Sequence, residues 1–201
     1  MILLINPDVP ANSPWGSSKM LPPLGLAYVA ASLQKEGFDV EVFDNYIFKK
    51  NTNFLKSLIE RKKPKIVGIS CNSVNYRLCL EMAKSVKEAD PSCIVVAGGP
   101  HPTFMPETML QHSEVDYVIL GEGERAMAEL TAKILEEGIE CHSILNIPGI
   151  AYRHGEKIVI NAPKFIEKLD EIPYPAREAL PIHLYDRKIP FLEAYPVDTM
   201  N

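Results

Sequence analysis

The residues best suited to contact a ligand lie in four short segments, each of which follows a predicted strand. One of them, residues 98–103, begins with Gly98-Gly99, and two glycines let a bulky ligand approach the backbone because no Cβ stands in the way. The other segments are residues 6–24, 70–75 and 121–124. Together they offer backbone N–H groups, glycines, small hydroxyls and asparagine amides, which suit a large ligand with many amides and one phosphate better than acid–base catalysis. A tight strand-to-helix turn is the alternative explanation of the two glycines.

Several common site motifs are absent from the chain. A dinucleotide fold would carry Gly-x-Gly-x-x-Gly after the first strand, where this chain has Asn6-Pro7-Asp8-Val9-Pro10, and no Walker-type Gly-Lys-Ser/Thr occurs. A phospho-acceptor site needs an acidic pair near the first strand, which is also missing. No two of the four cysteines have Cys-x2-Cys spacing, so we expect reduced, structural cysteines and no zinc site.

Hydrophobic periodicity predicts five strands in regular alternation with helices. The predicted strands are residues 1–6, 38–43, 65–70, 93–97 and 115–120, and the predicted helices are residues 21–35, 51–63, 77–89, 103–111 and 126–137. This alternation is typical of a Rossmann-like α/β fold: a parallel sheet with helices on both faces and right-handed crossovers. A flavodoxin-like strand order, 2-1-3-4-5, places the four glycine- and asparagine-containing segments at one edge of the sheet.

The character of the sequence changes after about residue 144. Residues 149–153 and 157–161 flank His154-Gly155-Glu156, which predicts a β-hairpin. The proline-rich segment that follows is typical of a linker or docking arm and not of a core. We therefore expect a Rossmann-like domain at residues 1–144, a hairpin extension at 145–162 and an extended linker at 163–201.

Composition excludes some partners. The chain has 201 residues, 46% of them hydrophobic, and a formal net charge of −5 with no basic stripe, which argues against a nucleic-acid partner. No apolar run approaches the roughly 20 residues needed to cross a bilayer. The amino terminus has neither the basic region nor the apolar length of a secretory signal, so we expect a cytoplasmic protein.

Three motifs resemble the cobalamin-binding domain at the front of many radical S-adenosylmethionine enzymes, among them methyltransferases and the anaerobic magnesium-protoporphyrin IX monomethyl ester cyclase. They are Leu21-Pro22-Pro23-Leu24-Gly25-Leu26, Val96-Ala97-Gly98-Gly99-Pro100-His101-Pro102-Thr103, and residues 115–124, VDYVILGEGE. Residues 169–177, LDEIPYPAR, also resemble the linker that precedes the catalytic barrel in those enzymes. The resemblance keeps the same order along nearly the whole chain.

The resemblance implies a corrin held at the carboxyl edge of the sheet, with the dimethylbenzimidazole tail between the sheet and its helices. The residues implied to contact the cofactor are Pro23, Leu24 and Gly25 beside the ring and tail; Ser70, Asn72 and Ser73 below the corrin or along the tail; Gly98, Gly99 and Pro100 in the tail slot; and Gly121, Glu122 and Gly123 at its far wall. His101 would approach cobalt or a propionamide, or else only shape its loop, and Glu122 and Glu124 would cap a helix or bind ligand hydroxyls. Gly99→Val is expected to block the slot and leave the fold intact.

Two departures limit what the chain does alone. The Asp-x-His-x-x-Gly motif that supplies a histidine to cobalt is missing, so we expect base-off cobalamin without that ligand. The Cys-x3-Cys-x2-Cys signature of the iron–sulfur cluster is missing too. The chain is then either a stand-alone carrier domain or, as we expect, a piece of a longer enzyme whose barrel holds S-adenosylmethionine and the [4Fe-4S] cluster. Cobalamin would then act as methyl carrier or redox partner. The alternatives are a docking or regulatory domain that has lost the cofactor, and an enzyme that binds another nucleotide at the same edge.

Overall fold

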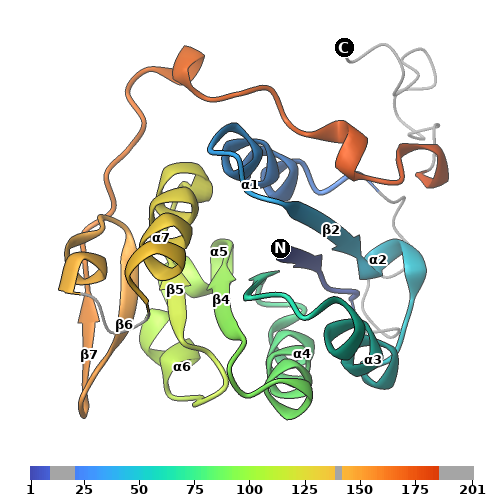
Figure 1. Ribbon diagram of the computed structural model, residues 1–201, viewed down its shortest axis with the longest axis horizontal. Coiled ribbons are helices and arrows are strands. Elements are labelled where there is room, and N and C mark those ends of the chain that lie inside the picture. The colour runs from blue at the N-terminus through green and yellow to red at the C-terminus, as the bar shows by residue number, and fades with distance from the viewer. Residues whose placement is uncertain (10–20, 139–141, 186–201) are drawn as a thin grey trace.

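The computed structural model describes residues 1–9, 21–138 and 142–185. Its centre is a seven-stranded sheet in the order β2-β1-β3-β4-β5-β6-β7 (Figure 1). The strands are β1 (Ile2–Asn6), β2 (Val40–Asp44), β3 (Ile66–Ser70), β4 (Ile94–Gly98), β5 (Tyr117–Ile119), β6 (Ile150–His154) and β7 (Lys157–Ile160). The first five strands are parallel, which confirms the Rossmann-like fold and the flavodoxin-like order.

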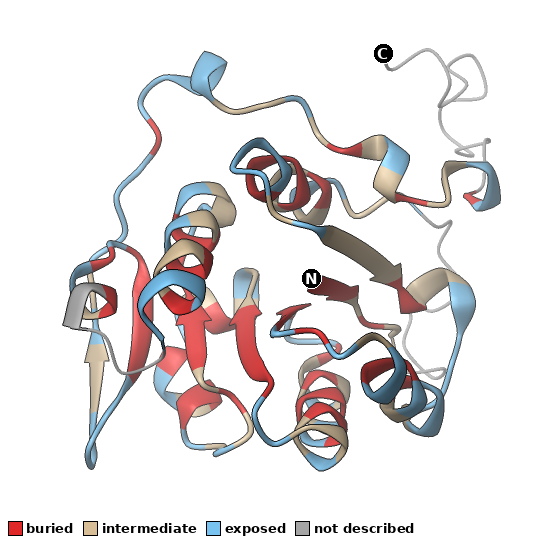
Figure 2. Cartoon of the chain, viewed as in Figure 1, coloured by how far each residue is buried: buried red, intermediate tan, exposed pale blue. Residues whose placement is uncertain are grey.

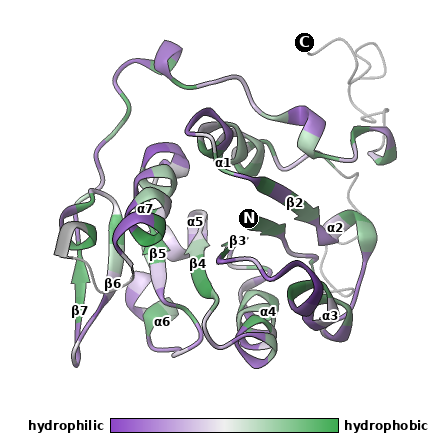
Figure 3. Cartoon of the chain, viewed as in Figure 1, coloured by the Kyte–Doolittle hydropathy of each residue, from purple (hydrophilic) through white to green (hydrophobic). Residues whose placement is uncertain are grey.

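The central strands are apolar because both faces of the sheet are covered. In β1, β3 and β4 the first four residues are all buried, whereas the edge strands β2 and β7 are mostly of intermediate burial or exposed (Figure 2). In Figure 3, β4 and β6 are drawn as hydrophobic, and so is the edge strand β7, although it is less buried. Alternate residues of each strand supply two separate cores, one on each side of the sheet.

Two groups of helices cover the two faces (Figure 1). Helices α1 (Leu24–Lys35) and α7 (Gly123–Glu137) contact each other and pack on one face, while α3 (Thr52–Lys62), α4 (Tyr76–Ala89) and α6 (Pro106–Leu110) pack on the other. The remaining short helices are α2 (Asn45–Phe48), which periodicity did not predict, α5 (Pro100–Phe104) and the 3-10 turn η1 (His142–Asn146). No helix in the described parts of the chain is long and apolar enough to cross a bilayer.

The single helix predicted at residues 103–111 is wrong in detail. The chain forms two shorter helices there, α5 and α6, which meet at Met105 with φ −134° and ψ 52°. The break follows from Pro106, because proline has no N–H to donate to the preceding turn and disfavours a helical conformation in the residue before it. Helix α7 likewise starts at Gly123, three residues before the predicted start, so Gly123 belongs to its first turn.

The predicted hairpin is present, and it extends the same sheet. Strand β6 pairs antiparallel with β5, Tyr117 opposite Tyr152, and β7 pairs with β6 around a turn in which Gly155 has a φ of 59°. This turn matches the predicted His154-Gly155-Glu156 signal. The addition of the hairpin covers the edge of β5, which would otherwise be exposed at that side of the sheet.

Residues 163–185, called the C-terminal strap below, correct the expectation that the proline-rich segment is not core. The strap contains the 3-10 turns η2 (Leu169–Glu171), η3 (Arg177–Ala179) and η4 (Ile182–Leu184) and crosses the side of the molecule formed by α1 (Figure 1). Ala176, Leu180 and Tyr185 are buried, and the Ala176 N–H donates to the Ala27 carbonyl of α1 at 3.0 Å. The strap is therefore packed against the domain over this length. Residues 186–201 lie outside the described residues.

Candidate cofactor site

A cavity of about 530 Å³ opens at the carboxyl edge of the sheet and continues between the sheet and the α1/α7 layer. Its volume lies within the usual range for small-molecule and cofactor sites. The lining combines a polar rim with an apolar interior from β1, β3, β4, β5 and α7. The lining residues are Leu4, Asn6, Pro23, Leu24, Gly25, Leu26, Val29, Gly68, Ile69, Ser70, Val96, Gly98, Gly99, Pro100, Ile119, Gly121, Glu122, Gly123, Glu124 and Met127.

Most of the residues singled out from the sequence meet in this cavity. They come from the starts of α1, α5 and α7 and from the end of β3, which is where a parallel sheet brings its loops together. The predicted residues that line the cavity are Pro23, Leu24, Gly25, Ser70, Gly98, Gly99, Pro100, Gly121, Glu122 and Gly123.

Asn72, Ser73 and His101 are not among the lining residues. The side-chain oxygen of Asn72 accepts from the N–H groups of Val74 (2.9 Å) and Asn75 (3.0 Å), so this amide holds its own loop together. Ser73 Oγ lies 3.2 Å from His101 Nδ1, and the imidazole packs against the Tyr76 ring, with centroids 4.5 Å apart and the ring planes tilted by 41°. The histidine therefore has structural partners on the α4 side of the edge, and contact of these three residues with a cofactor remains a prediction.

The loops that follow β3 and β4 are joined at Gly99. The Cys71 N–H donates to the Gly98 carbonyl at 2.7 Å, and the His101 N–H donates to the Cys71 carbonyl at 3.2 Å. Gly99 has a φ of 104°, and a Cβ there would lie 2.7 Å from the Cys71 carbonyl oxygen. The expectation that Gly99→Val would leave the fold intact is therefore wrong, because the substitution strains the backbone before any ligand is considered.

Gly25 offers a cleaner probe of the cavity. It lies in the first turn of α1, its φ is in the ordinary range, and a Cβ built on it meets no atom within 4 Å. A side chain introduced here has room on the protein side, so it can occupy cavity space without a clash.

Thr103 joins the third and fourth loops and was not predicted from the sequence. Its hydroxyl donates to the Gly99 carbonyl at 2.9 Å and accepts from the Gly121 N–H at 3.0 Å. One side chain thus holds two cavity walls at a constant separation. Threonine at the end of Gly-Gly-Pro-His-Pro-Thr was the only sequence signal, and it becomes informative once β4 and β5 are known to be neighbours.

The two glutamates after β5 have different roles, and neither side chain caps α7. Glu122 Oε2 accepts from the Ile166 N–H of the strap at 2.8 Å. Glu124 lines the cavity, and its buried Oε2 has no hydrogen-bond partner among the described residues. A buried acceptor without a donor is costly unless a ligand satisfies it, so Glu124 is the cavity residue best placed to receive an N–H or O–H group from a ligand.

Gly68 explains how the cavity reaches the middle of the sheet. It is a glycine inside β3, and a Cβ there would lie 2.7 Å from Leu4 Cδ2 and 3.5 Å from Met127 Cε. A lone glycine within a strand is a known sign of close approach by a ligand or another chain segment. The interior around it is apolar, as the aromatic base of a nucleotide requires.

These features fit the group that the resemblance implies. Cobalamin carries carboxamide and ribose donors that can satisfy the Glu124 oxygen, a flat base that fits the apolar depth beside Gly68, and a broad corrin that needs the side-chain-free rim at Gly25 and Gly98. A model of the B12 binding domain family matches residues 18–131. The chain belongs to this family.

Two relatives place the domain within larger proteins. The chain is 36% identical over 166 residues to an uncharacterized methyltransferase of Pyrococcus horikoshii, a match that spans 82% of this chain and 35% of the relative. It is 29% identical over 174 residues to the anaerobic magnesium-protoporphyrin IX monomethyl ester cyclase of a Synechocystis species, spanning 84% and 34% respectively. The chain therefore spans about a third of the length of these relatives.

Solved structures support the fold. The cobalamin-dependent S-adenosylmethionine radical enzyme OxsB with aqua-cobalamin bound superposes with a TM-score of 0.73 at 22% identity, over 87% of this chain and 24% of that one. The radical S-adenosylmethionine methyltransferase TsrM from Kitasatospora setae, with cobalamin and a [4Fe-4S] cluster bound, gives a TM-score of 0.66 at 22% identity, over 80% and 30%. The prediction of a cobalamin-binding domain is confirmed by the family match, its structural neighbours are radical S-adenosylmethionine enzymes, and nothing favours the cofactor-free alternative.

Proposed function

We propose that the domain holds cobalamin base-off, with the nucleotide tail in the 530 Å³ cavity and the corrin over the carboxyl edge, in the service of a radical S-adenosylmethionine barrel. The observation that carries the proposal is the coincidence of the cavity with the glycine-containing segments that follow β1, β4 and β5, together with the end of β3. The expectation of a cobalt without a histidine ligand rests on the sequence, which has no Asp-x-His-x-x-Gly motif after β1.

The chain's own residues would bind and orient the cofactor. The apolar depth formed by Leu4, Val96 and Met127 would exclude water from the base. Glu124 would accept a hydrogen bond from a carboxamide or hydroxyl donor, and the rim glycines would admit the corrin to the backbone. When bound, cobalamin supplies a cobalt centre that carries a methyl group or an electron.

The barrel would be a partner outside residues 1–201. The relatives are about three times as long as the matched region. The length of the relatives and the motif at residues 169–177 support a barrel in the same chain. The substrate and its methylation or cyclisation would be decided by that barrel.

The test is a titration of the purified chain with hydroxocobalamin, followed by gel filtration and a visible spectrum of the protein peak. We expect corrin absorbance to travel with the protein and to have the form typical of base-off cobalamin. Gly25→Leu should weaken binding by about an order of magnitude or more, because the leucine occupies the mouth of the cavity. The same change should raise the free energy of unfolding by up to about 1 kcal/mol, since leucine is a better helix former than glycine.

Gln34→Leu is the matched control. It introduces the same side chain on the exposed surface of the same helix, so it should leave cobalamin affinity unchanged. If the folded wild-type chain carries no corrin absorbance through gel filtration, the proposal fails. If Gly25→Leu binds as tightly as wild type, the cavity is not the site of the tail.

A further inference from the structure

A buried carboxylate connects the cavity to the C-terminal strap. Asp44, at the end of β2, is 0% exposed. Its Oδ1 accepts from Asn6 Nδ2 at 2.8 Å and from the Tyr46 N–H at 3.0 Å, and its Oδ2 accepts from the Tyr185 hydroxyl. All of these partners are donors, as an ionised carboxylate buried from solvent requires.

This arrangement determines how the Asn6 amide is turned. A carboxylate oxygen repels the amide oxygen and accepts only from the amide nitrogen, so Nδ2 must face Asp44 and Oδ1 must face away. Asn6 lies opposite Asp44 in the β1–β2 register and lines the cavity together with Leu4, two residues earlier on the same face of β1. No hydrogen bond to Asn6 Oδ1 occurs within the described part of the chain. Oδ1 is therefore a pre-oriented acceptor at the cavity.

The third partner of the carboxylate comes from the strap. Tyr185 is buried and packs with Ala27 of α1 and with Leu180 in a small core of their own. Burial, followed by the hydrogen bond to Asp44, raises the pKa of the Tyr185 hydroxyl well above its usual range, so the hydroxyl remains a donor at physiological pH. Tyr185 and Asp44 are 141 positions apart in the sequence, and this contact exists only when the strap is docked.

The strap touches the cavity wall at a second place. Its Ile166 N–H donates to Glu122, which lines the cavity on the far side from Asn6. In Figure 1 the strap, drawn from orange to red, passes from the β7 side of the molecule across α1 to the region of β2 and α2. The docked strap therefore contacts Glu122 at one wall of the cavity directly, and Asn6 at the other wall through Asp44.

We propose that Asn6 is a cofactor-contacting residue whose Oδ1 accepts an N–H or O–H donor of the bound cobalamin, and that Tyr185 and Asp44 are positioning residues that couple strap docking to cofactor affinity. The proposal rests on the proposed function and deepens it. Because coupling is reciprocal, a docked strap favours cobalamin, and bound cobalamin favours a docked strap. The barrel expected beyond the strap would thus be connected to the cofactor site by a chain of hydrogen bonds.

The alternative is that Asp44 only caps α2 and Tyr185 only packs. In that case Tyr185→Phe changes stability but not affinity, and its effect does not depend on residue 6. A double-mutant cycle separates the two explanations. The variants are Asn6→Ala, Tyr185→Phe and the double variant, and the control is Tyr174→Phe, a residue of the same strap that is 94% exposed.

Affinity for hydroxocobalamin is measured by titration of the full chain. The temperature is kept well below the melting temperature of the least stable variant. We expect Asn6→Ala to weaken binding by roughly tenfold and Tyr185→Phe by about three- to tenfold, the size of a single hydrogen bond. The double variant should bind like Asn6→Ala, because Tyr185 acts through Asn6. Tyr174→Phe should bind like wild type.

Two further measurements keep the result interpretable. In the wild-type chain alone, saturating cobalamin should slow tryptic cleavage of the strap after Lys168 and Arg177. Repeating the titrations with cobinamide, which keeps the corrin carboxamides but lacks the nucleotide, identifies the donor: an Asn6→Ala effect that persists assigns it to a corrin carboxamide, and one that disappears assigns it to the ribose.

The proposal is overturned if Tyr185→Phe binds as wild type, if the two single effects multiply in the double variant, or if cobalamin leaves strap cleavage unchanged. A wild-type chain that binds no cobalamin would instead contradict the proposed function itself, which distinguishes the two failures.

Discussion

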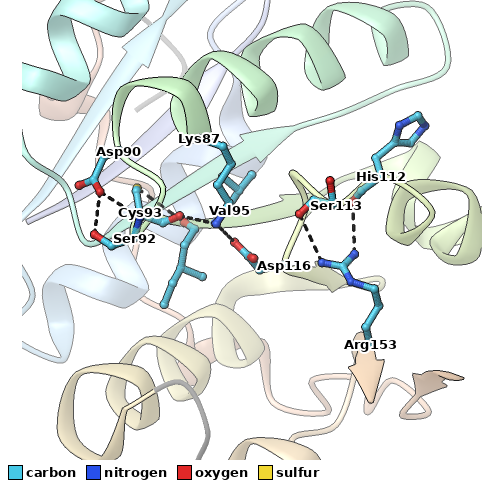
Figure 4. Close-up of polar contacts among 10 residues, drawn as sticks. Lys87, Asp90, Ser92, Cys93, Val95, His112, Ser113, Asp116 and Arg153 are labelled. Atoms are coloured by element: carbon cyan, nitrogen blue, oxygen red, sulfur yellow. Dashed lines mark hydrogen bonds and ion pairs between the residues drawn. The ribbon is translucent and has the colours of Figure 1, made fainter. Parts of the chain in front are cut away.

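The two edges of the parallel sheet are built in opposite ways. At the amino edge, side chains pair with one another and with the backbone (Figure 4). Lys87 Nζ lies 2.7 Å from the Asp116 carboxylate and donates to the Cys93 carbonyl at 2.7 Å, while Asp116 Oδ2 accepts from the Val95 N–H at 2.7 Å. One ion pair thus joins α4, β4 and the start of β5.

Arg153 closes the same edge from the hairpin. Its guanidinium donates to the carbonyls of Leu110 (2.9 Å), His112 (3.2 Å) and Ser113 (3.5 Å), which follow or end α6. A planar group with five donors is well suited to collect several carbonyls at once. The amino edge is therefore filled and cross-linked.

At the carboxyl edge, the residues around the cavity include several glycines, which have no side chain to fill the space. Glycines occupy positions 25, 98, 99, 121 and 123 around the cavity, and the loops are held mainly by backbone hydrogen bonds and by the Thr103 hydroxyl. The comparison teaches that one edge supplies stability and the other leaves space. A parallel sheet can divide these tasks because all its strands end at the same edge.

The largest expected difference between the edges is thiol accessibility. Burial raises the pKa of the Cys93 thiol to about 12, whereas Ser70 lines the open cavity. In a Cys141→Ser background, Ser70→Cys should react with iodoacetamide at pH 8.5 roughly a thousandfold faster than Cys93, since the thiolate is the nucleophile. Peptide mass spectrometry follows both, and saturating cobalamin should protect only position 70.

The sign of the pH effect follows from the same shift. The folded-state pKa of Cys93 is raised, so the stability contributed by its neutral thiol is complete below the unfolded pKa near 9 and is lost as the pH rises toward 12. Equal alkylation rates at positions 70 and 93 would contradict the distinction between a sealed and an open edge. An increase in the free energy of unfolding over this pH interval would contradict it too.

Asp116→Ala should produce the next largest effect. It removes the ion pair with Lys87 and leaves the N–H of Val95, a fully buried residue, without its acceptor. We expect a loss of about 2 kcal/mol in the free energy of unfolding, measured by urea denaturation. Cobalamin affinity should not change, because the site is at the other edge.

Glu88→Ala is the control for this prediction. Glu88 pairs with Lys56 on the surface, and an exposed pair is worth less than about 1 kcal/mol. A stability loss that is no greater for Asp116→Ala than for Glu88→Ala would show that the amino edge is not where the sheet is secured.

Thr103→Val should have the smallest effect on stability. In contrast to Asp116→Ala, it should change cobalamin affinity. Valine keeps the shape but removes the bridge between the Gly99 carbonyl and the Gly121 N–H, at a cost of about 1 kcal/mol. Because the two cavity walls are no longer held together, we expect cobalamin affinity to fall severalfold in the same titration. Thr52→Val, in the first turn of α3 and away from the cavity, should leave affinity unchanged. An unchanged affinity for Thr103→Val would mean that the walls do not need this bridge.

The comparison of edges also shows how far sequence reasoning reaches. The glycine loops and the alternation of strands and helices could be predicted, since strand periodicity and turn residues are local signals. The order of the parallel strands was predicted only by analogy with flavodoxin-like folds, and the structure confirms it. Asn6 was included only as the first residue of segment 6–24, and Gly68 was missed, because their roles depend on neighbours from other strands and helices: Asp44 in one case, Leu4 and Met127 in the other.

The docked path of the strap could not be predicted for the same reason. Its prolines are typical of a linker, and nothing local indicates that Ala176 meets Ala27 or that Tyr185 reaches Asp44. Such contacts join positions more than a hundred residues apart, and only the packed α1 surface makes them favourable.

The sequence by itself determined a parallel α/β sheet with glycine-rich loops at its carboxyl edge, because alternation and turn chemistry are encoded over a few residues. The tertiary structure decided which of those loops enclose space. It also decided that Gly99 is required by the Cys71 carbonyl, and that a buried carboxylate turns the Asn6 amide toward the cavity. The physical reason is that cavity shape and buried hydrogen bonds are properties of several chain segments at once, and no single segment carries them.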